Sequence, residues 1–252
     1  MELLRACLIL LARRRDGVPK KPIMRETPYG KPPKALSEHL FYGLVLDSAQ
    51  EVFRDAIWSE DVDIVFADAR AGTGKTLIAA ATANMLCEYG RYKGIVYIMS
   101  PCQEQTLGFL PGSQGDKESP YMEGFYQALM TIGVNMGMAL NDDISNQKQG
   151  TGYIETRTHT FLRGLNFENK VVILDESQNM TVPEMQKIIT RIHDNCKVVV
   201  IGHHLQIDIK NPSKSGFVRY LEHFKDKPRA TVCELTKNYR GWIASHADSI
   251  ND

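Results

Sequence analysis

Residues 69–76, Ala-Arg-Ala-Gly-Thr-Gly-Lys-Thr, constrain the fold of this chain more than any other segment. They follow an apolar run over residues 64–67 that predicts a buried strand, and they precede an alanine-rich segment over residues 77–86 with strong helix propensity. A strand, a glycine-containing turn and a helix in this order are the setting of a phosphate-binding loop. A glycine-rich turn that binds no ligand is the less favoured interpretation, because the strand, the loop, the Gly-Lys-Thr sequence and the helix all occur in the expected order.

The chemistry of this loop depends on four of its residues. Gly72 and Gly74 allow the tight turn that points successive backbone N–H groups at phosphate oxygens, and the following helix adds the positive end of its dipole. Lys75 can then reach the β- and γ-phosphates, and the Thr76 hydroxyl can coordinate Mg²⁺. The strict pattern begins with glycine, whereas this chain has alanine there, which adds only a methyl group. The predicted binding residues are Arg70, Ala71, Gly72, Thr73, Gly74, Lys75 and Thr76.

A second site of chemistry is expected where an aliphatic run over residues 171–174 is followed by Asp175 and Glu176. Such a run predicts a central strand covered on both faces, and ligands of open α/β sheets bind at the carboxyl ends of the strands. Asp175 is suited to hold Mg²⁺, and Glu176 can orient and deprotonate a water that attacks the γ-phosphate. Both residues could instead be ordinary helix caps, but the phosphate loop earlier in the chain favours the site.

The composition bounds the class of protein. The 252 residues suit one large domain or two small ones, and 30 basic and 30 acidic side chains cancel, so nucleic-acid binding would need a local patch. Five scattered cysteines without Cys-x-x-Cys spacing argue against disulfides and structural zinc, and indicate a reducing compartment. The apolar run at residues 3–12 is too short to span a bilayer. We therefore expect a cytoplasmic protein without membrane contact.

Domain organisation follows from the change in composition near residue 45. An N-terminal helix and an arm rich in Pro, Lys and Arg over residues 13–34 are expected within residues 1–45, and residues 46–252 are expected to form one domain. The arm is either a solvated linker or a contact for nucleic acid. Residues 46–57 show helical spacing, with Asp47 or Ser48 as N-cap and Gln50 on the first turn.

The remaining segments alternate between strands and helices. This order predicts an α/β fold with one parallel sheet and helices on both faces. Further strands are expected at residues 94–99, at 197–201 and, on an edge of the sheet, from residue 231; further helices at 121–140, 182–193 and 242–250; and exposed polar loops at 112–119 and 141–152.

Four polar residues in the last quarter of the chain are further candidates. His203 and His204 are adjacent, point in different directions and have no acidic or cysteine partner at ligand spacing, so we interpret them as polar site groups or loop residues. The topology permits Gln206 to sense the γ-phosphate. Arg240 can stabilise transition-state charge within the chain or on a neighbouring subunit, although a surface arginine is about as good an interpretation.

Several of these segments carry a resemblance to a known family. They are residues 69–76, Leu-Gly-Phe-Leu-Pro-Gly at 107–112, Ser-Pro-Tyr at 119–121, Thr-Phe-Leu-Arg-Gly at 160–164, residues 171–179, Met185 with 190–192, and Gly202 with 206–208. From residue 46 onward the sequence resembles the PhoH-like family of single-layer ATPases, which is related to the superfamily 1 helicase core. The resemblance implies a RecA-like P-loop NTPase fold.

The resemblance also implies ATP binding and hydrolysis with Mg²⁺. It implies that Gln50 contacts adenine, Gln206 senses the γ-phosphate, and Lys75 and Glu176 are catalytic. It further implies a homo-oligomer, such as a hexameric ring, and coupling to single-stranded RNA or DNA through the loops after residue 99 and around residue 112.

The chain departs from the family pattern at three positions. Ser100, Leu165 and His203 replace an arginine, an arginine and an aspartate, as in a divergent member such as a phage would encode. Conversely, Leu-Thr-Lys-Asn-Tyr-Arg at 235–240 resembles the arginine motif of superfamily 1 helicases, which favours Arg240. Two alternatives stay open: a nucleotide-gated protein-binding module with little hydrolysis, and a small-molecule kinase.

Overall fold

Six parallel strands form one sheet at the centre of the molecule. The structure is a computed structural model that describes residues 30–36, 40–100, 114–141, 152–159, 162 and 164–248. The strand order is β3-β2-β4-β5-β1-β6, so the strand before the phosphate loop lies between β5 and β6. The strands are β1 Ile64–Ala69, β2 Ile95–Met99, β3 Ile154–Thr158, β4 Val171–Asp175, β5 Lys197–Gly202 and β6 Ala230–Leu235.

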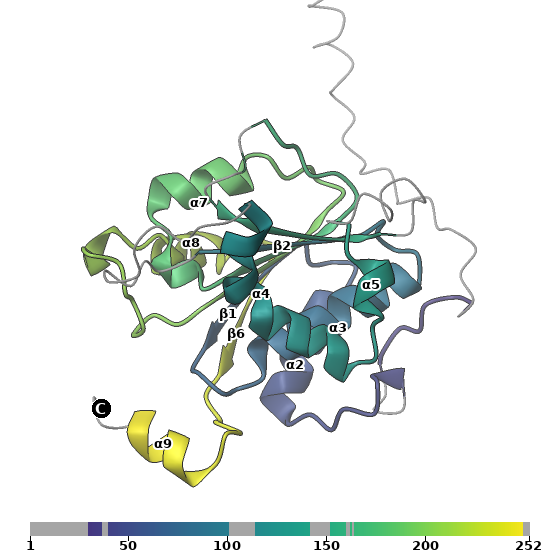
Figure 1. Ribbon diagram of the computed structural model, residues 1–252, viewed down its shortest axis with the longest axis horizontal. Coiled ribbons are helices and arrows are strands. Elements are labelled where there is room, and N and C mark those ends of the chain that lie inside the picture. Colours follow the sequence, from purple (N-terminus) through teal and green to yellow (C-terminus); the bar gives the residue numbers. More distant parts are fainter. Residues whose placement is uncertain are drawn as a thin grey trace, which may run out of the picture.

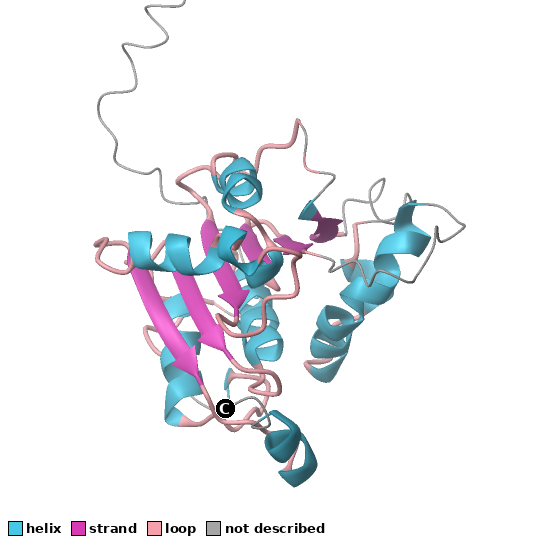
Figure 2. Cartoon of the chain, turned by 90° about the vertical axis from the view of Figure 1, so that its left-hand side faces the viewer, coloured by secondary structure: helices cyan, strands magenta, loops and turns pink. Residues whose placement is uncertain are grey.

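Helices cover both faces of this sheet, which confirms the predicted fold (Figures 1 and 2). Alternate side chains of β1 enter two different apolar clusters, Val65 on one face and Phe66 on the other. The first cluster packs against α2 Ser48–Trp58, α3 Lys75–Glu88 and α4 Gln114–Thr131. The second packs against α7 Val182–Ile189 and α8 Phe217–Phe224.

The helix after the phosphate loop is buried on every side, because each residue from Ile78 to Leu86 is buried. Its alanines at positions 79, 80, 81 and 83 are fully buried. Small side chains let α3 lie close to the sheet while α2 and α4 pack on its other sides, as the contacts among these helices show. The loop is therefore held by a helix that is fixed from all directions.

The expected helix at residues 121–140 is wrong in its bounds. α4 begins at Gln114, so the expected exposed loop at 112–119 is helical from there onward. α4 ends at Thr131 because Gly133 adopts a φ of 79° and its N–H bonds back to the Met130 carbonyl. A separate short helix, α5 Met136–Ala139, follows.

Two further elements have no counterpart in the sequence interpretation. β3 is a five-residue edge strand whose alternating polar residues give a weak signal, and α8 follows a short polar stretch. The last described element is α9 Trp242–Asp248, which projects from the sheet (Figure 1). No helix in the described ranges is both long and apolar enough to cross a membrane. The helix expected at 3–12, most of the arm, and the 107–112 segment lie outside the described residues.

Candidate functional site

The loop between β1 and α3 has the backbone that its sequence predicts. Gly72 and Gly74 have φ values of 74° and 79°, and Gly74 caps α3. A Cβ on Gly72 would lie 2.6 Å from Asn238 Oδ1, and a Cβ on Gly74 would lie 3.2 Å from Gln50 Nε2. The positive φ values favour glycine at both positions, and an added Cβ would also press on the Asn238 and Gln50 side chains.

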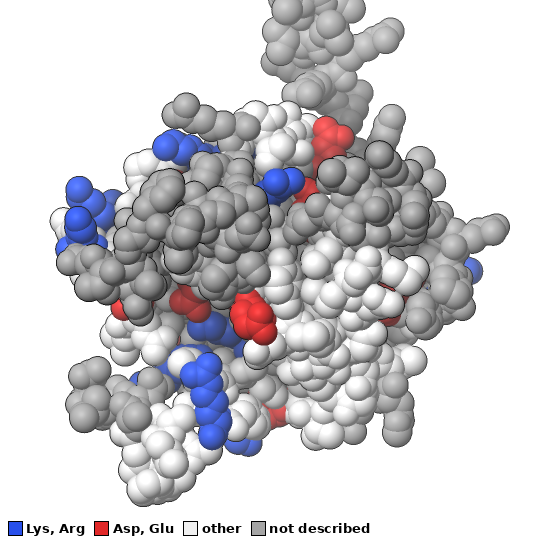
Figure 3. Space-filling view, in the orientation of Figure 1, with Lys and Arg blue, Asp and Glu red and all other residues white. Residues whose placement is uncertain are grey.

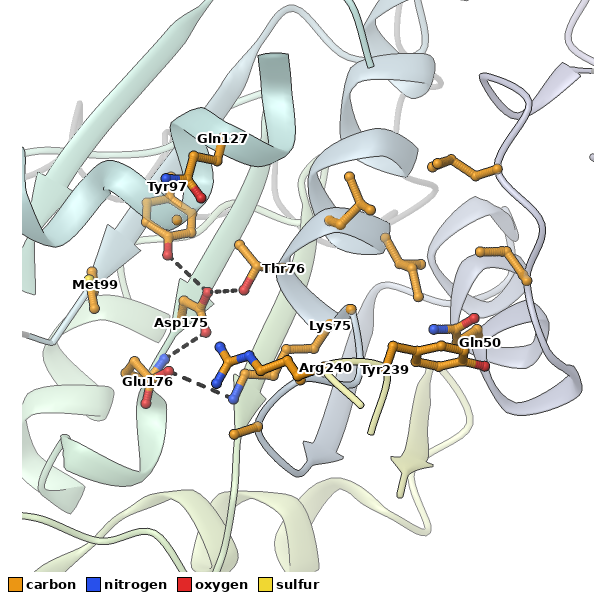
Figure 4. A pocket seen from close by; sticks show the side chains of 18 of the residues that line it. Gln50, Lys75, Thr76, Tyr97, Met99, Gln127, Asp175, Glu176, Tyr239 and Arg240 are labelled. Atoms are coloured by element: carbon orange, nitrogen blue, oxygen red, sulfur yellow. Dashed lines mark hydrogen bonds and ion pairs between the residues drawn. The ribbon is translucent and has the colours of Figure 1, made fainter. Parts of the chain in front are cut away.

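Two side chains converge on one carboxylate oxygen at the end of β4. Asp175 Oδ2 accepts hydrogen bonds from Thr76 Oγ1 at 2.8 Å and from the Tyr97 hydroxyl at 2.9 Å (Figure 4). Burial and the neighbouring Asp175 raise the pKa of Tyr97 well above its usual range, so it stays a donor. Tyr97 reaches the site because β2 pairs with β4. The sequence interpretation missed it, since a tyrosine within a strand gives no signal.

Glu176 follows in a left-handed conformation, with φ 50° and ψ 38°. This backbone is uncommon for a residue with a side chain and costs about 1–3 kcal/mol. Its Oε2 accepts a hydrogen bond from Gln178 Nε2 at 2.6 Å, and its Oε1 lies 3.7 Å from Lys75 Nζ. The strained turn therefore aims the carboxylate at the phosphate loop instead of along the next helix.

The segment after β6 packs directly on the phosphate loop. β6 pairs with β1 as far as Ala69 and Leu235, and the Tyr239 N–H then bonds to the Gly72 carbonyl at 2.8 Å. Arg240 Cγ lies against Gly72, where an added Cβ would come within 3.1 Å of it. Figure 4 shows the Arg240 side chain beside Lys75. The arginine thus belongs to the site of its own chain.

Gln50 braces the loop from the side of α2. Its Nε2 donates to the Thr73 carbonyl at 2.8 Å, while its Oε1 accepts from the Asp47 N–H in a capping box. One donor and one acceptor position of the amide remain for a ligand. The Tyr239 hydroxyl donates to Asp47 Oδ2 at 2.5 Å, which raises the pKa of Tyr239 and lowers the pKa of Asp47.

These segments enclose a pocket of about 800 Å³. Leu44, Leu46 and Leu77 contribute apolar side chains to its lining. Gln50 and Tyr239 lie on one side of the pocket, away from the carboxylates of Asp175 and Glu176 (Figure 4). On the face shown in Figure 3, basic and acidic atoms lie next to each other around a hollow near α9. Of the predicted site residues, those that line the pocket are Gln50, Ala71, Gly72, Gly74, Lys75, Thr76, Asp175, Glu176, Gln206 and Arg240.

Two predicted loop residues do not line the pocket. Thr73 is buried, and its hydroxyl donates to the Arg70 carbonyl at 3.0 Å, so both residues shape the loop from within. Among the departures from the family pattern, Ser100 is buried and donates to the Asn179 carbonyl. Leu165 packs against the second apolar cluster. Neither position presents a charge to the pocket.

The interpretation of the two histidines is wrong on two points, because both rings face one common group and that group is acidic. Asp68 of β1 supplies the acidic partner that the local sequence lacks: its carboxylate lies 3.1 Å from His203 Nδ1 and 2.6 Å from His204 Nδ1. The parallel register that places Asp68 beside Gly202 brings them together. A partner 135 residues away cannot be found from local spacing.

The fold and the loop define the class of protein, a P-loop NTPase domain with a RecA-like sheet. Residues 45–241 match the family described as PhoH-like protein, and the chain belongs to that family. Protein PhoH of Escherichia coli (strain K12) is 34% identical over 197 residues, which are 77% of this chain and 53% of that protein. PhoH-like protein of Bacillus subtilis (strain 168) is 33% identical over 175 residues, 69% of this chain and 52% of that protein. The chain thus spans about half the length of these relatives.

Solved structures share the fold at low sequence identity. The large terminase from a thermophilic bacteriophage has a TM-score of 0.50 at 12% identity, over 77% of this chain and 46% of that chain. The UvsW helicase from bacteriophage T4 has a TM-score of 0.50 at 12% identity, over 76% of this chain and 60% of that chain. This likeness concerns the fold alone and agrees with the predicted RecA-like sheet.

Proposed function

We propose that this chain is an ATPase that binds ATP in the pocket and hydrolyses it with Mg²⁺. The observation that carries the proposal is the 2.8 Å hydrogen bond between Thr76 and Asp175, which lie 99 residues apart. It joins a hydroxyl of the phosphate loop to a carboxylate at the end of a central strand. Such an arrangement serves a cation that bridges the protein and phosphate oxygens.

The phosphate groups would bind between the loop backbone and two cations. Lys75 Nζ lies 3.4 Å from the Ala69 carbonyl and 3.7 Å from Glu176, so its ammonium is held over the loop. Arg240 lies beside it and would neutralise the charge that develops on the γ-phosphate. Gln206, on the pocket wall, would hydrogen-bond the same group. Because Arg240 packs on Gly72 of its own chain, this role requires no neighbouring subunit.

The side-chain oxygens of Thr76 and Asp175 fit a magnesium ion. A hydroxyl and a carboxylate are the hard oxygen ligands that Mg²⁺ prefers, and Thr76 and Asp175 would hold it directly or through water. When bound, Mg²⁺ neutralises charge on the phosphate oxygens. The Tyr97 hydroxyl donates to the same carboxylate and fixes its orientation.

Glu176 is the proposed general base. Its carboxylate would accept a proton from the water that attacks the γ-phosphate, and the Gln178 amide holds it in place through the 2.6 Å hydrogen bond. In the structure the Lys75 ammonium lies 3.7 Å from this carboxylate. Phosphate oxygens would compete for the ammonium and leave Glu176 available to the water.

The nucleobase would lie on the side of the pocket that holds Gln50 and Tyr239. Leu44, Leu46 and Leu77 offer apolar contacts, and the Tyr239 ring lies on the same side as Gln50 (Figure 4). The free donor and acceptor positions of the Gln50 amide match the complementary pair that adenine presents on its edge. Adenine selection by Gln50 is therefore part of the proposal.

We also propose that hydrolysis is coupled to single-stranded RNA or DNA and that the protein acts as a homo-oligomer, such as a hexameric ring. The support is the fold that the chain shares with the UvsW helicase. The loops expected to contact nucleic acid, after Met99 and around Gly112, lie outside the described residues. Trp242 and Ile243 of α9 are exposed close to Arg240 and offer an apolar contact to a second copy.

Phosphate release from ATP and Mg²⁺ tests the proposal, with the Lys75→Ala variant as the blank. Release above the blank supports an ATPase, and faster release with single-stranded RNA or DNA supports coupling. Release without an added acceptor argues against a kinase. ATP binding by the wild type with no release above the blank would replace the enzyme by a nucleotide-gated binding module.

A further inference from the structure

Asp68, His203 and His204 form a compact cluster at the carboxyl end of the sheet. The Asp68 carboxylate faces Nδ1 of His203 at 3.1 Å and Nδ1 of His204 at 2.6 Å, and the two imidazole rings lie 5.1 Å apart. One donor atom from each residue lies within 4.8 Å of the others. Within the described part of the chain, no other group of three His, Cys, Asp or Glu residues has this spacing.

The sheet fixes this cluster more firmly than a loop could. Asp68 is the fifth residue of β1 and pairs with Gly202, the last residue of β5, so the two histidines follow at the level of the carboxylate. The His203 side chain is 7% exposed and the Asp68 side chain 18%, whereas His204 is 47% exposed. The His203 N–H also bonds to Gln178 Oε1 at 3.2 Å. Two ligands are thus held rigidly, and the third faces solvent and leaves an entry path.

The donor set selects a particular class of cation. Neutral imidazole suits Zn²⁺, Co²⁺ and Ni²⁺, whereas Mg²⁺ prefers oxygen ligands. Two ligand atoms bound to a tetrahedral zinc ion at about 2.0–2.2 Å lie about 3.4 Å apart, so small side-chain rotations bring all three donors around one ion. The carboxylate has no lysine or arginine partner among the described residues; its ion pairs join it to the two histidines. The single negative charge of Asp68 would balance half of the charge of a divalent ion.

The cluster is separate from the proposed magnesium position. None of its residues lines the pocket that contains Thr76 and Asp175. It connects to that pocket through Gln178, whose Oε1 accepts from the His203 N–H and whose Nε2 donates to Glu176. An ion at the cluster would therefore bind next to the catalytic end of the pocket without replacing any of its ligands.

We propose that Asp68, His203 and His204 bind one divalent transition-metal ion of the zinc class. The inference is independent of the ATPase proposal, because it concerns other residues and is tested without nucleotide. It explains the presence of histidine at position 203, which would add a nitrogen ligand beside Asp68.

Titration of the tag-free full chain with Co²⁺, followed by visible absorption, tests the site. The expected result is one Co²⁺ per chain, displaced by an equivalent of Zn²⁺ but not by excess Mg²⁺. The His204→Ala variant removes an exposed ligand with little risk to folding and should weaken binding at least about tenfold. Asp68→Asn should have a similar effect, and circular dichroism would verify that both variants fold.

Two matched variants make the test specific. His193 is another half-exposed histidine near a carboxylate, with its Nε2 3.4 Å from Glu168, but it lacks a third ligand, so His193→Ala should bind Co²⁺ like the wild type. Asp175→Asn should also retain binding, because it alters only the proposed magnesium site. The proposal is overturned if the wild type shows no Co²⁺ absorption. Equal affinity of the wild type and the folded His204→Ala and Asp68→Asn variants would overturn it as well.

Discussion

The two ends of the pocket are built in different ways. At the proposed phosphate end, Asp175 and Glu176 lie at the end of the central strand β4, and Asp175 is hydrogen-bonded to Thr76 at the start of α3. At the proposed base end, Tyr239 belongs to the segment after β6, and its hydrogen bond to Asp47 spans 192 residues. The chemistry of the first end depends on strand topology, while the shape of the second depends on where the chain returns after β6.

This contrast has a functional consequence. Changes at the phosphate end should alter the rate of the chemical step and leave nucleotide binding nearly intact. Changes at the base end should alter affinity and leave the chemical step nearly intact. The comparison would be wrong if substitutions at the phosphate end changed mainly the affinity, or if substitutions at the base end changed mainly the chemical step.

The largest effect is expected for Glu176→Gln. The amide keeps the shape of the side chain and cannot accept the proton of the attacking water, so kcat should fall about 10²- to 10⁴-fold. Nucleotide affinity should stay within a few-fold of the wild type. Steady-state phosphate release and binding of a fluorescent ATP analogue measure the two quantities.

Glu222→Gln is the control for this substitution, because Glu222 is exposed and pairs only with Lys225 among the described residues. It should leave both quantities unchanged. A Glu176→Gln variant with wild-type turnover would remove Glu176 from the mechanism.

Arg240→Ala should lower kcat about 100-fold with a smaller change in affinity, because the arginine acts on charge that develops in the transition state. Arg219→Ala, at an exposed position of α8 outside the pocket lining, is the control. The packing of Arg240 on Gly72 of its own chain also predicts the result of subunit mixing. Mixing Arg240→Ala with Glu176→Gln protein should restore no activity, whereas recovery would show that the arginine serves a neighbouring subunit.

Tyr239→Phe should affect affinity rather than turnover. It removes the 2.5 Å hydrogen bond to Asp47 and keeps the ring, so KM for ATP should rise about fivefold, equivalent to a hydrogen bond of about 1 kcal/mol, with kcat unchanged. Tyr220→Phe on α8, away from the pocket, is the matched control. A fall in kcat with unchanged KM would contradict the assignment of Tyr239 to the base end.

The smallest effect concerns the opposite end of the strands, where Lys197 begins the central strand β5. Its buried ammonium donates to the carbonyls of Ser59 and Val62, and desolvation lowers its pKa from 10.5 to about 7. Between these values the unfolded chain binds a proton that the folded chain lacks, so this group's contribution to stability rises with pH. Urea unfolding at pH 7 and at about pH 9 should show a larger gain with pH for the wild type than for Lys197→Met. An identical gain for both proteins would remove Lys197 as the cause.

The sequence predicted those parts of the fold that rest on local patterns. The phosphate loop, the aliphatic strands β1, β4 and β5 and the helix α3 follow directly from glycine spacing, apolar runs and alanine content. β3 was not predicted, because a short polar edge strand gives no apolar run. The end of α4 was not predicted either, because it depends on the single left-handed Gly133. The secondary structure of segments with a strong local pattern can be predicted from the sequence, whereas that of segments defined by their tertiary neighbours cannot.

The same division applies to the candidate site. Lys75 and Glu176 each belong to a sequence motif that can be recognised locally. In the structure Lys75 Nζ lies 3.7 Å from Glu176 Oε1. Tyr97 and Tyr239 reach the pocket only through strand pairing and chain return, which local spacing does not encode. Asp68 joins the two histidines for the same reason, since a parallel register links residues far apart in the chain.

A crystal structure of the protein with Mg²⁺ and a non-hydrolysable ATP analogue tests the central claim most directly. The account predicts a cation bound to Thr76 Oγ1 and close to Asp175, with the γ-phosphate between Lys75 and Arg240 of the same chain and the Glu176 carboxylate facing it. A triphosphate bound away from the loop, or a γ-phosphate that Glu176 cannot approach, would contradict the assignment of this pocket as the site of ATP hydrolysis.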